Sequence, residues 1–348
     1  MVRSETDVTT ARFDLERRRH GAALPSFGGQ EATVIGDDHA LTPGYVARHV
    51  PPGSKIGIHV AVLDIAQDFL LAHLAERGVL GDLAIFKGGT ALRKLFAGAR
   101  GRFSTDMDFA SREPEADRYA LAEIIAGEAD VALGPFRFRP SSTRGRWHIA
   151  VESPFGNPAI SVKLDVGPPT WLEPEPRPFV PHATHDRYGF TLPTIASARL
   201  EEILAEKIAR LTRSGTARDA SDLVWAATTS PHSGFLIDRV RRLAMLKVWV
   251  DNHGLGPAWS SALSPRPFDP ERWLSPREDW DDEQIGLLTH PPPSLSELEA
   301  KLHRLYAWLG DLTEKEGRLA SADARDRSEV IRAVRDLAHS ALTDTHLW

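Results

Sequence analysis

The sequence contains no cysteine among its 348 residues. This absence excludes disulfide bonds, thiolate zinc sites and cysteine nucleophiles, and it favours a cytoplasmic protein because disulfides are typical of oxidising compartments. A metal ion bound by this chain therefore needs oxygen or imidazole ligands. The 14 histidines show no spacing that is typical of a metal site.

Long apolar runs and a targeting segment are also missing from the pattern. No apolar run approaches the roughly 18 residues of a membrane span, and Arg3, Glu5 and Asp7 precede any apolar stretch. We therefore expect neither a membrane span nor a secretory signal. The formal net charge of −6 argues against non-specific binding to nucleic acid over the whole surface, although it is compatible with a local basic groove.

The chain divides into three parts. Residues 1–52 carry scattered charges and glycines without periodicity, which predicts an N-terminal arm or extension. Residues 53–180 mix helical and strand periodicities and predict an α+β core with a mixed sheet. A proline-rich bridge at 168–181 leads to residues 181–348, whose pattern predicts a mainly helical C-terminal domain.

Within the core, a helix is predicted from Lys55 up to Gly78, followed by a buried strand at 83–86 and a helical segment at 91–96. The elements expected beyond these are a strand at 103–110, a helix at 115–126 and an antiparallel meander of strands at 136–139, 147–152 and 160–166. The helices predicted for the C-terminal part span 200–211, 217–227, 235–252, 295–309 and 325–339. Ser294 and Glu297 form a capping box for the fourth of these helices.

A glycine turn separates the strand at 83–86 from the helical segment that follows. It consists of Lys87, Gly88, Gly89 and Thr90. Glycines let backbone N–H groups approach a phosphate, and a helix N-terminus favours negative charge. Thr90 is placed either to cap the helix or to bond a phosphate oxygen. Because an isolated Gly-Gly pair usually only bends a chain, the turn indicates a nucleotide site only together with the acids that follow it.

Two aspartates share one face of the strand at 103–110. Side chains alternate along a strand, so Ser104, Asp106 and Asp108 point to one face. Met107 and Phe109 then belong to the opposite, apolar face. The two carboxylates are close enough to ligate one hard cation, and oxygen ligands predict Mg²⁺ or Mn²⁺. A pair of surface acids is the alternative, and the nearby glycine turn favours the metal site.

A third acid comes from the meander. Lys163 and Asp165 share one face of the strand at 160–166. In two-metal nucleotidyl transfer a third carboxylate binds metal and accepts a proton, so Asp165 is a candidate metal ligand. Lys163 beside it is a candidate nucleotide contact. The alternative is an ordinary, half-exposed edge strand.

The helix predicted at 200–211 has a lysine inside its apolar stripe. Lys207 falls among the apolar positions, so its ammonium either reaches solvent along its aliphatic stem or meets a triphosphate. Asp219 and Asp222 follow three positions apart on one face of the next helix. An ion pair between Asp219 and the neighbouring Arg218 is the alternative to a functional role.

Together these blocks resemble the AbiEii/AbiGii-type nucleotidyltransferase toxins of bacterial toxin–antitoxin systems, a branch of the DNA polymerase β-like superfamily. The residues that carry the resemblance are Lys87-Gly88-Gly89-Thr90-Ala91-Leu92, Arg102-Phe103-Ser104-Thr105-Asp106-Met107-Asp108-Phe109, and Lys207 with Arg218-Asp219-x-x-Asp222-Leu223. The resemblance covers residues 56–230 and is only general in the helical remainder.

The resemblance implies a polymerase β-like core that transfers NMP from an NTP with metal ions and releases pyrophosphate. It implies a nucleotide-binding turn at Gly88, Gly89 and Thr90, a catalytic block at Ser104, Asp106 and Asp108, and a triphosphate contact by Lys207. It also implies a catalytic acid, Asp219, with Asp222 as the other possibility. The implied partners are a tRNA acceptor at its 3′ end and a cognate antitoxin. The alternatives are transfer to a small molecule or a protein hydroxyl, or a non-catalytic relative that binds a nucleotide or a partner.

Two groups of basic residues are candidates for contacts with RNA phosphates. The first group lies on the meander and consists of Arg137, Arg139, Arg144 and Arg146. The second lies on the helix at 235–252 and consists of Arg239, Arg241, Arg242 and Lys247. Charge runs of this kind are usually solvated, so solubility is the alternative role for both groups.

Overall fold

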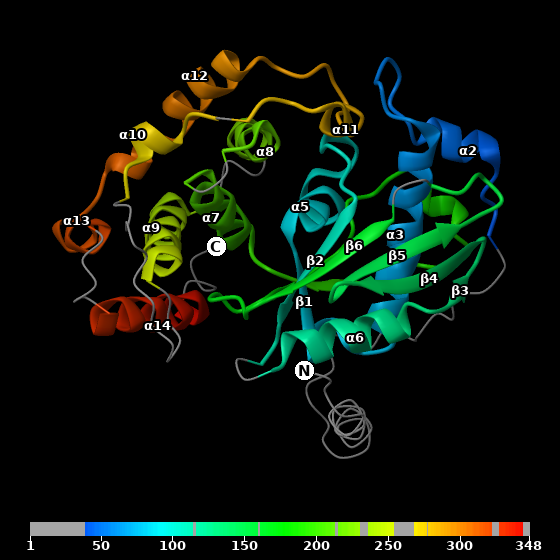
Figure 1. Cartoon of the computed structure of the whole chain (residues 1–348), viewed down its shortest axis with the longest axis horizontal. Helices are drawn as coiled ribbons and strands as arrows, with labels where there is room; N and C mark the ends of the chain where they lie inside the picture. The colour runs from blue at the N-terminus through cyan, green and yellow to red at the C-terminus, as the bar shows by residue number, and fades with distance from the viewer. Residues whose placement is uncertain are drawn as a thin grey trace. The chain divides into compact units, whose positions relative to one another are not determined.

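The computed structural model describes residues 39–113, 116–158, 161–212, 215–229, 236–253, 268–276, 278–321 and 327–343. They fall into two compact units (Figure 1). The first unit holds the described residues up to 170 together with 174–197, and the second holds 171–173 and the described residues from 198 onward. Most of the predicted N-terminal arm, residues 1–38, lies outside the described residues. The rest of it contains the short helix α2 (Pro43–Arg48).

The strands that the structure describes form one mixed sheet of eight strands in the first unit, in the order β3-β4-β5-β6-β2-β1-β8-β7. The strands are β1 (Ala84–Lys87), β2 (Asp106–Ser111), β3 (Ala132–Leu133), β4 (Phe136–Thr143), β5 (Arg146–Glu152), β6 (Val162–Gly167), β7 (Glu175–Arg177) and β8 (Ile195–Ser197). As predicted, β4, β5 and β6 form an antiparallel meander. The pairs β2 with β6 and β1 with β8 are parallel. The α+β class with a mixed sheet is confirmed.

The strands β7 and β8 differ from the sequence prediction, which treats the proline-rich stretch only as a bridge. Pro176 lies in the middle of β7 and pairs with Ala196 of β8. Proline is tolerated there because β7 forms the edge of the sheet, where a strand has a neighbour on one side only. Strands of three residues are too short to show an alternating pattern in the sequence.

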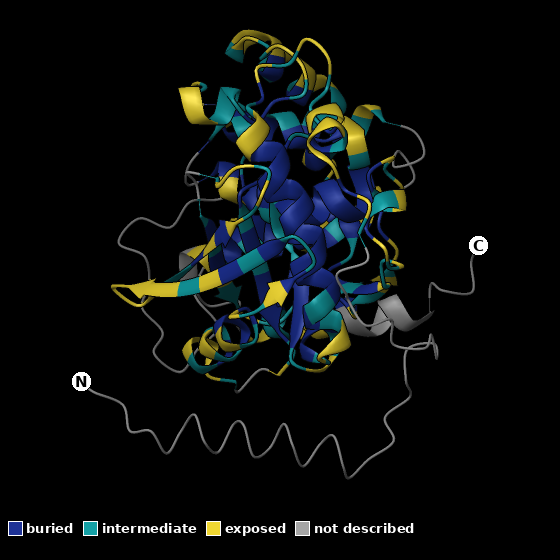
Figure 2. Cartoon of the chain, turned by 90° about the vertical axis from the view of Figure 1, so that its right-hand side faces the viewer, coloured by how far each residue is buried: buried dark blue, intermediate teal, exposed yellow. Residues whose placement is uncertain are grey.

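The sheet has one apolar face and one polar face. Phe86 on β1 pairs with Phe109 on β2, and both side chains are fully buried. Leu164 on β6 lies level with Met107 on β2 and extends the apolar face. The polar face contains the aspartates of β2, as the alternation along the strand predicts. Figure 2 colours the described residues by burial, with buried residues in dark blue and exposed residues in yellow.

Helix α3 (Ile58–Glu76) is a core helix of the first unit. It corrects the expectation about apolar runs, because an 18-residue window of α3 has a mean hydropathy of 1.4, sufficient by length and composition to cross a membrane. However, 78% of that window is buried inside the protein. The helix ends as predicted before Gly78, whose φ of 71° is left-handed. Two aspartates, Asp64 and Asp68, are buried along it.

The helical segment after β1 changes its geometry along its length. Helix α5 (Gly88–Ala91) passes directly into η1 (Leu92–Ala97), which is π-helical, and then into the 3₁₀ turn η2 (Gly98–Arg100). Helix α6 (Arg118–Glu128) begins at the capping residue Asp117 and packs along β4, β5 and β6 (Figure 1).

The second unit is mainly helical in its described residues, as predicted. Its elements are α7 (Leu200–Leu211), α8 (Ala217–Thr228), α9 (Ile237–His253), α10 (Pro270–Trp273), α11 (Asp282–Ile285), α12 (Leu295–Leu305), η5 (Ala307–Gly310), α13 (Glu314–Ala320) and α14 (Arg327–Thr343). Helix α7 packs against α8 and α9, and α8 packs against α12. The predicted capping box of Ser294 and Glu297 is present at the start of α12.

Candidate active site

The glycine turn and the two aspartates of β2 lie side by side in the first unit. Strands β1 and β2 pair so that Lys87 is opposite Asp108. A Cβ atom added at Gly88 would lie 2.1 Å from Oδ2 of Asp108, so only glycine lets the carboxylate lie this close to the backbone. Gly88 also has a φ of 79°, in the left-handed region that favours glycine. The turn therefore requires glycine at this position for two independent reasons.

The second glycine of the turn faces the segment that precedes β2. A Cβ atom at Gly89 would lie 2.9 Å from Nη2 of Arg102 and 3.3 Å from Oγ of Ser104. Ser104 is buried, and its carbonyl accepts a hydrogen bond of 3.0 Å from Nε2 of Gln67 on α3. Arg102 brings a positive charge to the turn. The sequence analysis includes Arg102 in the block that carries the resemblance and strand alternation places it on the face of Ser104, but no role is predicted for it.

Thr90 joins the turn to β2. Its hydroxyl donates a hydrogen bond to the backbone carbonyl of Asp106, and its side chain is fully buried. The capping role considered for Thr90 is wrong, because α5 begins at Gly88 and has Lys87 as its N-cap. Since the hydroxyl proton is engaged by Asp106, the backbone N–H groups of this first turn remain as the donors suited to a phosphate.

Three carboxylates share the polar face of neighbouring strands. The parallel pairing of β2 with β6 places Asp106 opposite Lys163 and Asp108 opposite Asp165. Their oxygen donors suit a hard divalent cation. Asp165 contacts the ammonium of Lys163, and no group of three acidic or histidine side chains within the described residues is gathered closely enough to hold a metal ion. The three carboxylates therefore offer suitable oxygen donors on one strand face, but they are not gathered around one point in the described residues.

Lys207 forms a buried cluster with both candidate acids of the second unit. Its Nζ on α7 lies 3.0 Å from Oδ1 of Asp219 and 2.7 Å from Oδ2 of Asp222, both on α8. Lys207 is 7% exposed, so its ammonium is held mainly by the two carboxylates and does not extend freely into solvent. Thr216, the N-cap of α8, donates a hydrogen bond of 3.0 Å to Oδ2 of Asp219. The sequence leaves the choice between the two acids open, and in the structure both bind the same lysine.

Comparison with known proteins places the chain in a family. The family model of the AbiEii nucleotidyltransferase toxins, of type IV toxin–antitoxin systems, matches residues 70–304. This chain belongs to the AbiEii family. It is accordingly an NTP-dependent nucleotidyltransferase toxin of a type IV toxin–antitoxin system. The resemblance inferred from the glycine turn and the Asp-x-Asp block is confirmed.

A solved structure supports the AbiEii assignment. The nucleotidyltransferase toxin MenT4 from Mycobacterium tuberculosis H37Rv is similar to this chain with a TM-score of 0.73 and 35% sequence identity. The match covers 85% of this chain and 99% of that chain. No curated protein matches the sequence. The range of the AbiEii family model includes the glycine turn, the aspartates of β2 and the Lys207 cluster.

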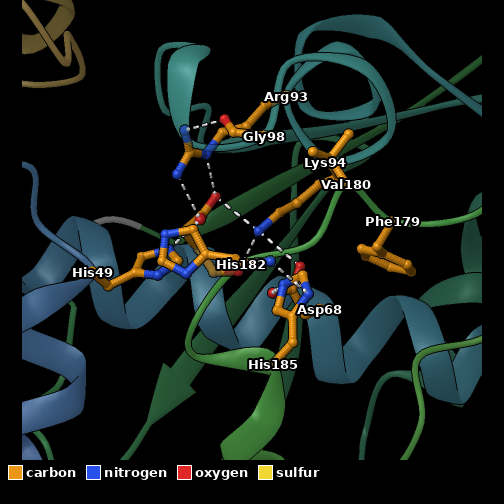
Figure 3. Close-up of a pocket in the computed structure, with 10 residues that line it drawn as sticks. His49, Asp68, Arg93, Lys94, Gly98, Phe179, Val180, His182 and His185 are labelled. Carbon is orange, nitrogen blue, oxygen red and sulfur yellow. Dashed lines mark hydrogen bonds and ion pairs between the residues drawn. The ribbon is translucent and has the colours of Figure 1, made fainter.

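A buried charge network lies beneath the helix that follows the glycine turn of this AbiEii toxin (Figure 3). Arg93 on η1 forms two hydrogen bonds with Asp64 on α3, at 2.9 Å from Nε and 3.0 Å from Nη2. Nζ of Lys94 lies 2.8 Å from Oδ1 of Asp64 and 2.8 Å from Oδ1 of Asp68. Two carboxylates on α3 therefore balance two cations on η1 and fix the orientation of the helix that begins at the turn.

Further side chains complete the hydrogen bonding of these carboxylates. Nε2 of His49 lies 2.6 Å from Oδ2 of Asp64, and the hydroxyl of Tyr188 donates a bond of 2.6 Å to Oδ2 of Asp68. Burial alone would raise the pKa of Asp64, but the charges of Arg93 and Lys94 outweigh it and hold this pKa well below its usual range. The sequence signal for the network is the spacing of two acids, one helical turn apart, within the apolar helix α3.

The charged residues of this network and His49 line a cavity of about 260 Å³, counting its part open to solvent (Figure 3). His182 lies at this cavity, and its ring centroid is 4.2 Å from that of His49. Burial, with the nearby His49 and His185, lowers the pKa of His182 to about 4. His182 is therefore neutral in the folded protein at every pH well above 4, whereas in an unfolded chain it would gain a proton near pH 6.5.

The protein is expected to lose stability as the pH falls from 6.5 toward 4. In this window the unfolded state binds a proton at His182 that the folded state does not bind, so the free energy of unfolding decreases with falling pH. The expected contribution is about 1–2 kcal/mol, after allowance for the partial solvent exposure of the ring. Urea unfolding at pH 6.5 and pH 4.5 measures it, because the low pKa values of Asp64 and Asp68 place their own losses at lower pH.

The variant His182→Gln should flatten this pH dependence, since glutamine does not titrate. Replacing the exposed His290 by glutamine is the matched control and should leave the slope of the parent protein unchanged. Burial also lowers the pKa of His73, so this residue contributes in the same direction and keeps a residual slope in the His182 variant. If the free energy of unfolding changes equally with pH in the parent and in His182→Gln, the pH dependence does not come from His182.

Proposed function

We propose that this AbiEii toxin transfers a nucleoside monophosphate from an NTP to the 3′ end of an RNA, with tRNA as the acceptor, and releases pyrophosphate. The observation that carries the proposal is the contact between the Gly88-Gly89 turn and Asp108, with Asp106 on the same face of β2. Helix N-termini bind phosphates, and paired carboxylates would repel a triphosphate unless a cation lies between them. This combination suits a nucleotide that is bound together with a divalent metal ion.

The chemistry follows from the residues that surround the turn. The acceptor hydroxyl oxygen forms a bond to the α-phosphorus, and the bond from this phosphorus to the oxygen bridging to the β-phosphate breaks. Pyrophosphate leaves, and Asp165 takes the proton of the hydroxyl. The backbone N–H groups of Gly88 and Gly89, with Arg102 near them, orient the triphosphate. Additional phosphate contacts come from Lys87, Thr90 through its backbone, Ser104 and Lys163.

The metal-binding part of the proposal concerns Asp106, Asp108 and Asp165. These carboxylates would hold Mg²⁺ or Mn²⁺, which when bound neutralises charge on the triphosphate and activates the hydroxyl. Their role as ligands is supported by their common strand face and by the pairing of Asp108 with Asp165. The three aspartates would also keep the triphosphate and the acceptor at one end of β2.

Lys207 is proposed to contact the triphosphate, with Asp219 and Asp222 holding its ammonium in place. The AbiEii resemblance supports this role, and the short ion pairs support the positioning. Replacing Lys207 by alanine is expected to raise the KM for NTP about tenfold or more, because one charge-assisted hydrogen bond is lost. If the contact is equal in ground and transition states, kcat changes little. Initial rates at varied NTP concentration measure both constants.

The removal of Lys207 also leaves two buried carboxylates together, so stability needs a control. The double variant Lys207→Ala with Asp222→Asn removes one of these charges and should restore folding while keeping the higher KM. An unchanged KM and kcat in the folded double variant would contradict a role for Lys207. A lower kcat with an unchanged KM would place its contact in the transition state only.

The proposal is tested by incubating the protein and its Asp106→Ala variant with each labelled NTP, Mg²⁺ and total cellular RNA. A labelled band of tRNA size from the parent protein alone is the expected result, and it also names the nucleotide. Labelling of no RNA, with pyrophosphate released when cell extract is added, would favour a small-molecule or protein acceptor. NTP binding without any pyrophosphate release would favour a non-catalytic role.

The type IV toxin–antitoxin assignment implies an antitoxin as the partner of this protein. Because tRNA is used in the cytoplasm, a cytoplasmic site of action belongs to the same proposal. Co-expression with the antitoxin should relieve the growth arrest that the parent toxin causes, and the Asp106→Ala variant should cause no arrest at all.

A further inference from the structure

The polar face of β2 continues sideways across the sheet of the first unit. Asp106 on β2 is level with Lys163 on β6. Lys163 is level with His148 on β5, and His148 is level with Ser141 on β4. Residues that are level on neighbouring strands point to the same face of a sheet. One polar row therefore runs from the catalytic block to the hairpin formed by β4 and β5.

A second row runs beside the first. Asp108 is level with Asp165 on β6. The pairing of β5 with β6 ends at Trp147 with Leu164, so Arg146 and Asp165 are the next residues beyond the paired ends, and Arg146 pairs with Thr143 on β4. Neighbouring strands lie about 4.8 Å apart, so the backbone of Arg146 is about 10 Å from that of Asp108. This is close enough for one extended ligand to contact both ends of the row.

The arginines of this hairpin differ in whether they form ion pairs with acidic side chains. Arg137 is paired with Asp130 at 2.6 Å, and Arg139 is paired with Glu152 at 2.7 Å. Arg144 and Arg146 are exposed, and no ion pair joins either of them to an acid in the described part of the chain. The outer half of the hairpin is exposed on both strands (Figure 2). Its positive charge is thus concentrated at the tip.

The tip is also shaped by its turn. Arg144 has a φ of 52° and Gly145 a φ of 75°, which are the left-handed conformations of a tight two-residue hairpin turn. Such a turn fixes the backbone at the tip, so Arg144 and Arg146 lie on either side of Gly145 and bring two cations to the tip. The half-exposed His148 follows on the same strand face as Arg146 and adds hydrogen-bonding capacity.

We infer that the polar face of the β4–β5 hairpin binds the phosphates of a polynucleotide acceptor just upstream of its 3′ hydroxyl, through Arg144, Arg146 and His148. The inference rests on the proposed function, because an acceptor hydroxyl placed at Asp108 leaves its preceding nucleotides over β6 and β5. A phosphodiester backbone complements the charge at the tip. A small molecule or a protein hydroxyl would have no row of phosphates to place there.

The test compares two double variants of the first unit, one at the tip of the hairpin and one away from it. Arg144→Asn with Arg146→Gln removes the two tip charges, and asparagine tolerates the left-handed conformation at the turn. Arg77→Gln with Arg118→Gln removes the same number of charges from exposed positions at the end of α3 and on α6 and serves as the matched control. The measurements are the KM for an RNA that ends in a 3′ hydroxyl, the KM for NTP, and the salt dependence of RNA binding by fluorescence anisotropy.

The tip variant is expected to raise the KM for RNA about tenfold or more at low salt, to leave the KM for NTP unchanged, and to reduce the salt slope by about 2. The control is expected to stay within about twofold of the parent protein in both constants. An unchanged KM for RNA and an unchanged salt slope in the tip variant, while the parent labels RNA, would overturn the inference alone. A parent protein that labels no RNA would overturn the proposed function and this inference with it.

Discussion

Replacing Asp106 by alanine is expected to abolish nucleotidyl transfer and to leave the protein folded. Asp106 is half-exposed on the polar face of β2, where it supplies one of the carboxylates that are proposed to hold the metal ion. Loss of metal-assisted charge stabilisation costs several kcal/mol in the transition state, which corresponds to a rate about 10³-fold lower or more. The fold tolerates the change because it removes a carboxylate from beside Asp108 and so relieves repulsion.

The measurement is kcat/KM with labelled NTP, together with a thermal unfolding curve of the same preparation. Glu123→Ala is the matched control, since it removes an exposed carboxylate from α6 in the same unit. It should change the rate by less than about twofold, as is typical of surface positions. Activity within tenfold of the parent protein, in an Asp106→Ala variant that unfolds like the parent, would rule out Asp106 as a catalytic residue.

Replacing Asp64 by alanine is expected to lower the free energy of unfolding by about 3–5 kcal/mol. Asp64 is 3% exposed and binds Arg93, Lys94 and His49. Removing it leaves two buried cations with only Asp68 to balance them, and an uncompensated buried charge is strongly destabilising. The lowered pKa of Asp64 agrees with this expected loss, because a carboxylate whose pKa is held low contributes stability at neutral pH.

Urea unfolding at pH 7 measures this loss. The control is Asp130→Ala, which breaks the exposed pair of Asp130 with Arg137 and should cost about 0–1 kcal/mol. If Asp64→Ala does not fold, Asp64→Asn keeps the shape of the side chain, and its loss should still exceed that of the control by about 1 kcal/mol. Equal losses for the Asp64 variants and the surface control would show that the network is not a stabilising element.

Sequence periodicity predicted the faces of elements well and their contacts poorly. Strand alternation correctly separated Asp106 and Asp108 from Met107 and Phe109 on β2. Helical periodicity predicted the bounds of α7 correctly as 200–211, because its apolar stripe is regular and ends where the helix ends. In both cases the information is local, since a side chain's face depends only on its own element.

Contacts between elements depend on tertiary packing, which the sequence pattern does not contain. The stripe of α7 showed that Lys207 is buried, yet its partners lie on α8, so the sequence offered only solvent or a triphosphate. The partners of Asp64 likewise come from η1, which is far away in the chain. The same limit applies to the second group of basic residues, on α9, because their partners could not be predicted from the sequence. Lys247 on α9 is paired with Glu202 on α7, and Arg242 with Glu316, so these cations are used inside the second unit.

The π-helical geometry of η1 has a consequence for how this family can vary in length. A π-helical turn accommodates one residue more than an α-helical turn. Deleting one residue within η1 would convert this turn to α-helical winding and change the angular spacing of its side chains. Arg93 and Lys94 would then no longer both face α3. Homologous sequences should therefore tolerate insertions and deletions at the exposed tip of the β4–β5 hairpin, and should keep a constant number of residues between the glycine turn and Gly98.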